Sequence, residues 1–161
     1  MIDDFDPPTQ TDETERIRKR AIQLLDRRAM SAKELMDKLT QKGEDPHQAE
    51  DAVHWLVEIG LLCDASYAEQ VVRHYGDRGY GRRRIQQELW RRGVSRDLWE
   101  VALETLPEER DDLDRFIQAK LRGEIPDRRE EKRVADALAR RGYTWDEISA
   151  GMRRYLESVE E

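Results

Sequence analysis

Residues 89–93 read Leu-Trp-Arg-Arg-Gly, and the same kind of segment recurs as Leu-Thr-Gln-Lys-Gly at 39–43 and Leu-Ala-Arg-Arg-Gly at 138–142. Each segment is typical of a helix C-terminus, because basic side chains favour the negative end of the helix dipole and glycine adopts the left-handed conformation at little cost. The three glycines are 50 and 49 residues apart. This regular spacing predicts a tandem repeat of a helical unit.

Aligned on these glycines, five positions are apolar in all three copies, which chance would rarely produce in a chain that is 37% hydrophobic. They lie at helical spacing on both sides of the glycine. In copy order, the five sets are Leu35, Ile85 and Val134; Leu39, Leu89 and Leu138; Ala49, Trp99 and Ile148; Val53, Leu103 and Met152; and Leu56, Leu106 and Tyr155. We expect these residues to form the core of each unit.

Helix start signals precede most of the expected helices. Capping boxes begin at Ser31, Asp127 and Thr144, while Asp45 before a proline and Ser95 are further N-cap candidates. An additional apolar stripe precedes each helix pair, including Ile17, Ala21, Leu24 and Leu25 in copy one, Tyr67, Val71, His74 and Tyr75 in copy two, and Phe116, Ile117 and Leu121 in copy three. Together they predict nine helices, at 13–28, 31–42, 46–59, 64–77, 81–92, 95–105, 108–122, 128–141 and 144–158. No segment alternates with period two, so we predict no sheet.

The predicted organisation is an all-α tandem array of three three-helix repeats, similar to helix-turn-helix or homeodomain-like units. The repeats span residues 13–62, 63–107 and 108–158, and residues 1–12, which are acidic and contain two prolines, are expected to be a disordered tail. Each unit alone has few apolar positions, so stacking against its neighbours is needed for stability. We therefore expect an elongated, curved rod.

The charge distribution narrows the classes of partner. The formal net charge is -7 and the pI is about 5.2, which argues against a protein that coats nucleic acid generally. The charge is uneven: residues 73–92 hold seven Arg and two acids, whereas residues 96–114 hold two Arg and eight acids. Arg82, Arg83, Arg84, Arg91 and Arg92 belong to one predicted helix, and their side chains either solvate it or form a contact surface, the interpretation we favour.

Several functional classes find no support in the sequence. The single cysteine, Cys63, has no internal disulfide partner, and no apolar run approaches membrane-spanning length. His47, His54 and His74 lack the spacing of a metal site, and no phosphate-binding loop, dinucleotide turn or nucleophile elbow occurs. The acidic N-terminus does not read as a signal peptide. We expect a cytoplasmic protein with no catalytic residues, metal or cofactor.

The densest segment runs Gly60-Leu-Leu-Cys-Asp-Ala-Ser-Tyr-Ala-Glu69, then Gly79-Tyr-Gly-Arg-Arg-Arg-Ile-Gln-Gln-Glu-Leu89, and ends Arg92-Gly-Val94. This pattern resembles the RecX family, as does Arg140-Arg-Gly-Tyr-Thr-Trp-Asp-Glu-Ile148, and the resemblance covers about residues 16–156. Two features depart from the family's pattern. Cys63 stands where the family usually has Asn or Asp, and the start of the third copy is acidic instead of aromatic-rich.

The resemblance implies a function in DNA repair, recombination and the SOS response. RecX-like proteins bind the RecA filament along its groove and inhibit its ATPase, strand-exchange and co-protease activities. By resemblance, the chain is expected to act as a monomeric RecA inhibitor, with a secondary contact to single-stranded DNA inside the filament left open. The alternative is a DNA-binding protein of helix-turn-helix type acting in transcription or nucleoid architecture, and a structural adaptor is a third class.

The expected contact residues lie in and around the basic segment. Tyr80 lies between Gly79 and Gly81, a pattern that either presents the ring to a partner or forms a helix cap and loop in which the ring packs inward. The predicted partner-binding residues are Arg73, Arg78, Tyr80, Arg82, Arg83, Arg84, Arg91 and Arg92.

Overall fold

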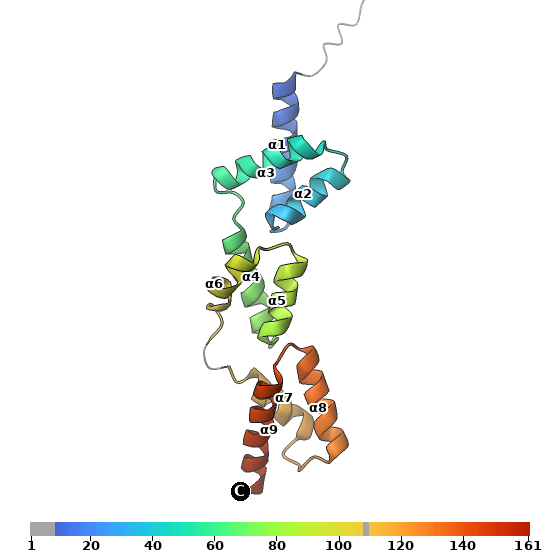
Figure 1. The fold of residues 1–161 in the computed structure, drawn as a ribbon, viewed down its shortest axis with the longest axis vertical. Helices are drawn as coiled ribbons and strands as arrows, with labels where there is room; N and C mark the ends of the chain where they lie inside the picture. The colour runs from blue at the N-terminus through green and yellow to red at the C-terminus, as the bar shows by residue number, and fades with distance from the viewer. Residues whose placement is uncertain (1–8, 108–109) are drawn as a thin grey trace, which may run out of the picture. The chain divides into compact units, whose positions relative to one another are not determined.

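The computed structural model describes residues 9–107 and 110–161, and within these ranges the regular structure is entirely helical (Figure 1). The elements are α1 (Gln10–Arg27), α2 (Ala32–Gln41), α3 (Pro46–Glu58), α4 (Asp64–Asp77), α5 (Arg82–Arg91), the 3-10 helix η1 (Arg96–Leu98), α6 (Trp99–Leu103), α7 (Asp112–Leu121), α8 (Arg128–Arg140) and α9 (Trp145–Glu160). The all-α prediction is confirmed.

The helices belong to two compact units. The first contains α1, α2, α3, the start of α4 as far as Tyr67, and residues 92–94; the second contains the rest of α4, then α5 to α9. In the first unit, α3 packs against both α1 and α2, around a core that includes Leu35, Leu39 and Leu56. In the second, α9 packs against α7 and α8, around a core that includes Ile117 and Leu138.

The predicted apolar register agrees with the observed burial. Twelve of the fifteen aligned residues are buried, and Trp99, Leu106 and Met152 are half-buried. The glycines on which the copies were aligned all have positive φ, 93° at Gly43, 75° at Gly93 and 98° at Gly142. The capping boxes at Ser31, Asp127 and Thr144 are formed, and the side chain of Asp45 accepts hydrogen bonds from the first turn of α3. These features need only local interactions, so the sequence was sufficient to predict them.

Three local predictions were wrong. The segment 95–105 is not one helix but η1 followed by the five-residue α6. The Ser95 side chain forms no cap, although its carbonyl accepts from Leu98 N in the 3-10 turn. His74 is exposed, and Ala68 and Val72 are buried on α4 in its place.

The ends of the predicted elements also shifted. The acidic tail was expected to reach residue 12, but α1 already begins at Gln10, because Thr9 accepts a hydrogen bond from Asp12 N; residues 1–8 lie outside the described ranges. In the third copy, the helix expected from residue 108 begins at Asp112, and residues 108–109 are likewise outside the described ranges.

One buried carboxylate joins α1 to the turn after α2. Glu44 follows the left-handed Gly43 and its side chain is only 4% exposed. Arg16 donates to both of its oxygens, at 2.7 and 2.9 Å, and Arg20 donates to Oε1 at 2.7 Å. The hydrogen bonds from Arg16 lower the pKa of Glu44 below its ordinary value, and with the one from Arg20 they outweigh the opposite effect of burial. The buried charge is therefore fully paired.

Candidate functional site: the exposed face of α5

The helix α5 presents a surface without acidic side chains. Ile85 and Leu89 are fully buried, and Glu88, the only acid in the helix, is 2% exposed. Among the described α-helices, α5 alone has no acid at an exposed or half-buried position. In a chain with a net charge of -7, this is a localised positive surface.

Four exposed side chains form one face of this helix. Arg83, Gln87, Trp90 and Arg91 follow the spacing i, i+4, i+7 and i+8, which places them on one side. We call these four residues the α5 face. Trp90 is 73% exposed, and Arg83 forms no side-chain hydrogen bond or ion pair with another described residue. Exposed Trp and Arg are the residue types most often found at the energetic centre of protein interfaces.

The start of α5 is held by backbone contacts from the turn after α8. The Gly81 amide donates to the Arg141 carbonyl at 2.7 Å, and the Arg83 amide donates to the Gly142 carbonyl at 3.1 Å. These two bonds satisfy amides that no side chain caps. A Cβ at Gly81 would lie 2.5 Å from the Gly142 carbonyl oxygen, so only glycine permits this approach.

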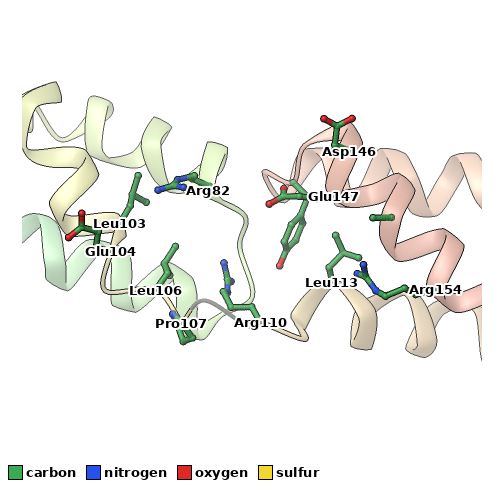
Figure 2. A pocket seen from close by; sticks show the side chains of 12 residues that line it. Arg82, Leu103, Glu104, Leu106, Pro107, Arg110, Leu113, Asp146, Glu147 and Arg154 are labelled. Atoms are coloured by element: carbon green, nitrogen blue, oxygen red, sulfur yellow. The ribbon is translucent and has the colours of Figure 1, made fainter.

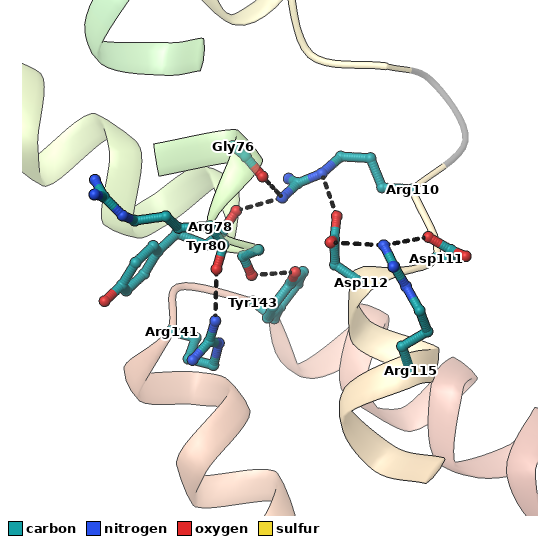
Figure 3. A network of polar contacts seen from close by, with 10 residues as sticks. Gly76, Arg78, Tyr80, Arg110, Asp111, Asp112, Arg115, Arg141 and Tyr143 are labelled. Carbon is teal, nitrogen blue, oxygen red and sulfur yellow. Dashed lines mark hydrogen bonds and ion pairs between the residues drawn. The ribbon is translucent and has the colours of Figure 1, made fainter. Parts of the chain in front are cut away.

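A polar network also joins the residues before α5 to Arg110 and to the turn after α8, and we call this region the junction (Figure 3). Arg110 donates to the carbonyls of Gly76 and Tyr80 at 3.3 and 2.8 Å, and to Asp112 at 3.1 Å. Arg141 donates to the Arg78 carbonyl at 2.7 Å. The Tyr143 hydroxyl donates to the Gly79 carbonyl at 2.7 Å, and burial raises the pKa of this hydroxyl.

The junction accounts for both glycines of the Gly79-Tyr80-Gly81 motif. Gly79 ends the α4 turn at φ 78°, and Gly81 allows the close approach described above. The Tyr80 ring is half-buried, lies edge-on to Tyr75, and has the guanidinium groups of Arg84 and Arg141 near it at 5.9 and 5.0 Å. The motif therefore has a structural role, and the Tyr80 ring packs within the unit.

The structure separates the predicted arginines into groups with different surroundings. Arg84 and Arg91 lie 3.4 and 3.7 Å from the buried Glu88, but Arg91 stays 70% exposed. Arg92 donates to the Tyr67 hydroxyl at 2.8 Å. Arg91 is 70% exposed and only 3.7 Å from one oxygen of Glu88, so most of its guanidinium surface remains available to a partner.

The contact of Arg92 belongs to a chain of hydrogen bonds in the first unit. The Tyr67 hydroxyl donates to Glu34 at 2.7 Å, and Arg28 lies 3.1 Å from the same carboxylate. Burial acts to raise the pKa of Glu34, but the hydrogen bonds from Tyr67, the Ser31 amide and Arg28 together lower it. Arg92 therefore supports the packing of the first unit.

The remaining predicted arginines lie outside the α5 face. Arg73 is 3.7 Å from Glu69 on α4, and Arg78, in the turn after α4, contacts His74 Nδ1 at 3.0 Å. Arg82 is 3.8 Å from Glu100 and lines a cavity of about 760 Å³ in the second unit (Figure 2).

That cavity has balanced charges. Arg82, Arg110 and Arg154 line it together with Glu104, Asp146 and Glu147. Arg110 and Arg154 already bind Asp112 and Asp114. The part of the chain that the structure describes contains no group of three or more His, Cys, Asp or Glu placed to hold a metal ion.

Sequence reasoning missed Trp90. The aligned residues in the other copies are Thr40 and Ala139, so a large aromatic side chain at this position falls outside the apolar register. That mismatch was the available signal, because an aromatic residue off the buried stripe of a helix must be exposed or cover a neighbouring element.

Comparison with known proteins identifies the family. The family model of the first three-helix domain of RecX matches residues 18–56, and that of the second matches residues 64–103. The Regulatory protein RecX of Halorhodospira halophila is 38% identical over 144 residues, which cover 85% of this chain and 86% of that protein. This chain belongs to the RecX family. The Regulatory protein RecX of Pseudomonas syringae pv. tomato is 39% identical, over 88% of this chain and 92% of the relative.

Solved RecX structures have the same fold. RecX from Lactobacillus salivarius superposes with a TM-score of 0.81 at 19% identity, over 90% of this chain and 97% of that chain. A second crystal structure of regulatory protein RecX gives 0.74 at 21% identity, over 83% of this chain and 68% of that chain. None of the helices described here is long and apolar enough to cross a membrane.

Proposed function

We propose that this chain is a non-enzymatic, cytoplasmic regulator that binds the RecA filament as a monomer and inhibits its ATPase, strand-exchange and co-protease activities. The observation that carries the proposal is its membership of the RecX family, whose relatives are named regulatory proteins and match over most of their length. The proposal includes three tandem three-helix repeats, at 13–62, 63–107 and 108–158. Several modest contacts from such repeats would add up to tight binding of a repetitive polymer.

The proposed contact is centred on the α5 face. Arg83 and Arg91 supply positive charge for an acidic protein surface, and Trp90 supplies a large apolar side chain beside them. Opposite charges across an interface mainly raise the association rate, while a buried aromatic residue contributes to affinity. We propose secondary contacts with the partner for the other predicted residues, Arg73, Arg78, Tyr80, Arg82, Arg84 and Arg92.

The acidity of the helices after the glycine turns disfavours duplex-DNA recognition. In a helix-turn-helix protein, the helix after the turn enters the major groove. Here those helices are α3, α6 and α9, and each carries exposed acids, including Glu50, Glu100 and Glu157. Acids at these positions would repel the phosphate backbone, and α6 has only five residues. The observation that still favours DNA binding is the acid-free surface of α5.

A pair of matched double variants tests the proposal. Arg83→Glu with Trp90→Ala removes one Arg and one Trp from the α5 face. Arg153→Glu with Trp145→Ala makes the same chemical change elsewhere in the second unit, where Trp145 is 72% exposed and Arg153 is also exposed. We expect both proteins to keep their far-UV circular dichroism spectrum. Only the α5 variant should lose inhibition of RecA ATPase, and inhibition by the wild-type chain should weaken as salt is raised.

Three outcomes would contradict these statements. If the unchanged chain does not inhibit RecA, the proposed function is wrong. If the α5 variant inhibits as well as the unchanged chain, the contact lies elsewhere. If the unchanged chain binds duplex DNA at physiological salt without RecA and the α5 variant does not, the DNA-binding alternative is correct.

A further inference from the structure

The cavity of about 760 Å³ in the second unit has a partly apolar lining (Figure 2). We call it the α6–α9 cavity. Leu103 in α6 and Leu113 in α7 line it and are buried, and Ala150 in α9 lines it and is half-buried. Leu106 and Pro107, between α6 and α7, add two more apolar side chains. Cavities of roughly 300–1,000 Å³ accommodate small ligands, so this one has room for large side chains of a partner.

The arginines of this lining are paired with acids that are not part of it. The pairs are Arg82 with Glu100 at 3.8 Å, Arg110 with Asp112 at 3.1 Å and Arg154 with Asp114 at 2.8 Å. Opposite charges this close together largely cancel each other's field at a ligand that lies farther away. The equal numbers of arginines and acids in the lining therefore do not make the cavity neutral.

The acids of the lining, in contrast, have no cation beside them. Glu104, Asp146 and Glu147 are exposed, and none of the three forms an ion pair with another residue that the structure describes. Glu147 accepts a hydrogen bond from the Thr144 amide at 2.7 Å, which leaves its charge in place. With the partners of the arginines counted, the cavity has six carboxylates and three guanidinium groups, a net charge of -3. The cavity therefore favours a cation.

The unpaired acids lie on two sides of the cavity. Figure 2 shows Glu104 on one side and Asp146 with Glu147 on the other. Glu104 directly follows α6, and the other two acids belong to the first turn of α9. A ligand that fills the cavity can therefore place an apolar group between two positive ones.

This order of charge and apolar surface suits one face of a basic amphipathic helix. Such a helix binds by placing apolar side chains, spaced at helical intervals, into a groove of its partner. The stems of Lys and Arg lie along apolar surface while their charged ends reach carboxylates at its edge. A nucleic acid or an acidic protein segment would instead be repelled by the net negative charge of the cavity.

We propose that the α6–α9 cavity is a docking site for a basic amphipathic helix of a partner protein. An apolar side chain of that helix packs against Leu103, Leu113 and Ala150, and Lys or Arg side chains on either side of it pair with Glu104 and Asp146. The site accepts the opposite charge from the α5 face, whose cations suit an acidic surface. Its binding requires no RecA and does not depend on the proposed function.

The test measures binding of a labelled model peptide to the full chain by fluorescence anisotropy. The peptide has Leu and Lys at helical spacing over about four turns, which is about 14 residues. Glu104→Gln with Asp146→Asn removes two unpaired charges of the cavity. The control, Asp51→Asn with Glu157→Gln, removes two exposed charges from α3 and α9 that do not line the cavity, so the two variants have the same net charge.

A second pair of variants tests the apolar part of the site without changing any charge. Ala150→Phe places a large ring in the lining of the cavity. Ala119→Phe makes the same change at an exposed position of α7 that does not line the cavity. Circular dichroism verifies that all four variants keep the helical fold.

Both cavity variants should lose affinity, whereas both controls should keep it. Glu104→Gln with Asp146→Asn should bind the peptide at least about tenfold more weakly at low salt, because the charge pairs are lost. Ala150→Phe should lose a similar factor, because the ring occupies the space of the apolar side chain. The controls should stay within about twofold of the unchanged chain, since isolated surface charges contribute little.

Four results would overturn the proposal. If the unchanged chain does not bind the peptide at low salt, the site does not exist. Equal losses in the charge variant and its control would show only general attraction to an acidic chain. Equal affinity for a peptide with Ser in place of every Leu would show that the apolar lining is not used. If sedimentation velocity shows a dimer of the unchanged chain that the charge variant abolishes, the occupant is a second copy. None of these experiments contains RecA, so their failure and the failure of the proposed function are distinguishable.

Discussion

Alanine substitutions at Gly43, Gly93 and Gly142 should differ in cost, although the three residues occupy the same position in their copies. All three have positive φ, so each Ala incurs the penalty of about 1–2 kcal/mol for the left-handed conformation. Their surroundings differ. A Cβ at Gly43 would meet no atom within 4 Å, whereas at Gly93 it would lie 2.6 Å from Lys33 Cδ and 2.7 Å from Lys33 Cβ. At Gly142 it would lie 2.5 Å from Arg84 Cβ and still closer to the Arg84 amide.

These differences give the expected order. Gly43→Ala should cost about 1–2 kcal/mol, the conformational penalty alone. Gly93→Ala should cost somewhat more, because Lys33 Cδ must move away and Lys33 Cβ, which is fixed to the α2 backbone, requires a small backbone shift. Gly142→Ala forces backbone apart and breaks the bonds from the Gly81 and Arg83 amides, each worth about 0.5–1.5 kcal/mol. Its total should reach about 2–5 kcal/mol.

Equilibrium urea unfolding followed by circular dichroism measures the three free energies of unfolding. Because an array of repeats can unfold in more than one step, hydrogen exchange at the Gly81 and Arg83 amides provides a local measurement. Protection of these two amides should fall in Gly142→Ala and stay unchanged in Gly43→Ala. Equal free energies for the Gly43 and Gly142 variants, with unchanged amide protection, would refute the role of the glycine turn in docking onto α5.

Two further predictions concern single side chains. Leu89→Ala should lower the free energy of unfolding by about 2–5 kcal/mol, because Leu89 is fully buried, and an unchanged thermal midpoint would show that the apolar register is wrong. Because Arg16 lowers the pKa of Glu44, this carboxylate stabilises the folded state above about pH 4.3 and loses that effect as the pH falls through its folded pKa. Glu44→Gln should destabilise the chain at pH 7 and flatten the decline of stability below pH 4.3, whereas Glu50→Gln, at an exposed position of α3, should do neither.

The helices and the family could be inferred from the sequence because their signals are local. Capping residues, left-handed glycines and apolar spacing each act within a turn or two of helix, so they appear in the chain as short patterns. The predictions that were wrong concern positions where two local patterns compete. Ser95 was a candidate N-cap, but a 3-10 turn formed there without a side-chain cap. His74 fitted the spacing of the apolar stripe on α4, but Val72 is buried in its place.

Tertiary structure decides which arginines of residues 73–92 are available to a partner. Seven Arg in residues 73–92 look equivalent in the sequence, yet Arg92 binds Tyr67, Arg84 lies beside the buried Glu88, and Arg83 faces outward. Trp90 completes that outward face only because Leu89 points into the core. A side chain's partners depend on which distant segments approach it, and the repeat pattern does not encode that.

The sequence by itself determined the helical repeat, its glycine turns and the RecX family, since these rest on backbone preferences and apolar periodicity. Only the tertiary structure decided how the turns are used. The Gly142 turn caps α5 from about 60 residues away, and Arg110 fixes the Gly76 and Tyr80 carbonyls from 34 and 30 residues away. The same docking brings the Arg141 guanidinium near the rings of both Phe116 and Tyr80. Such contacts form when buried backbone groups need partners, and the nearest ones then belong to another helix.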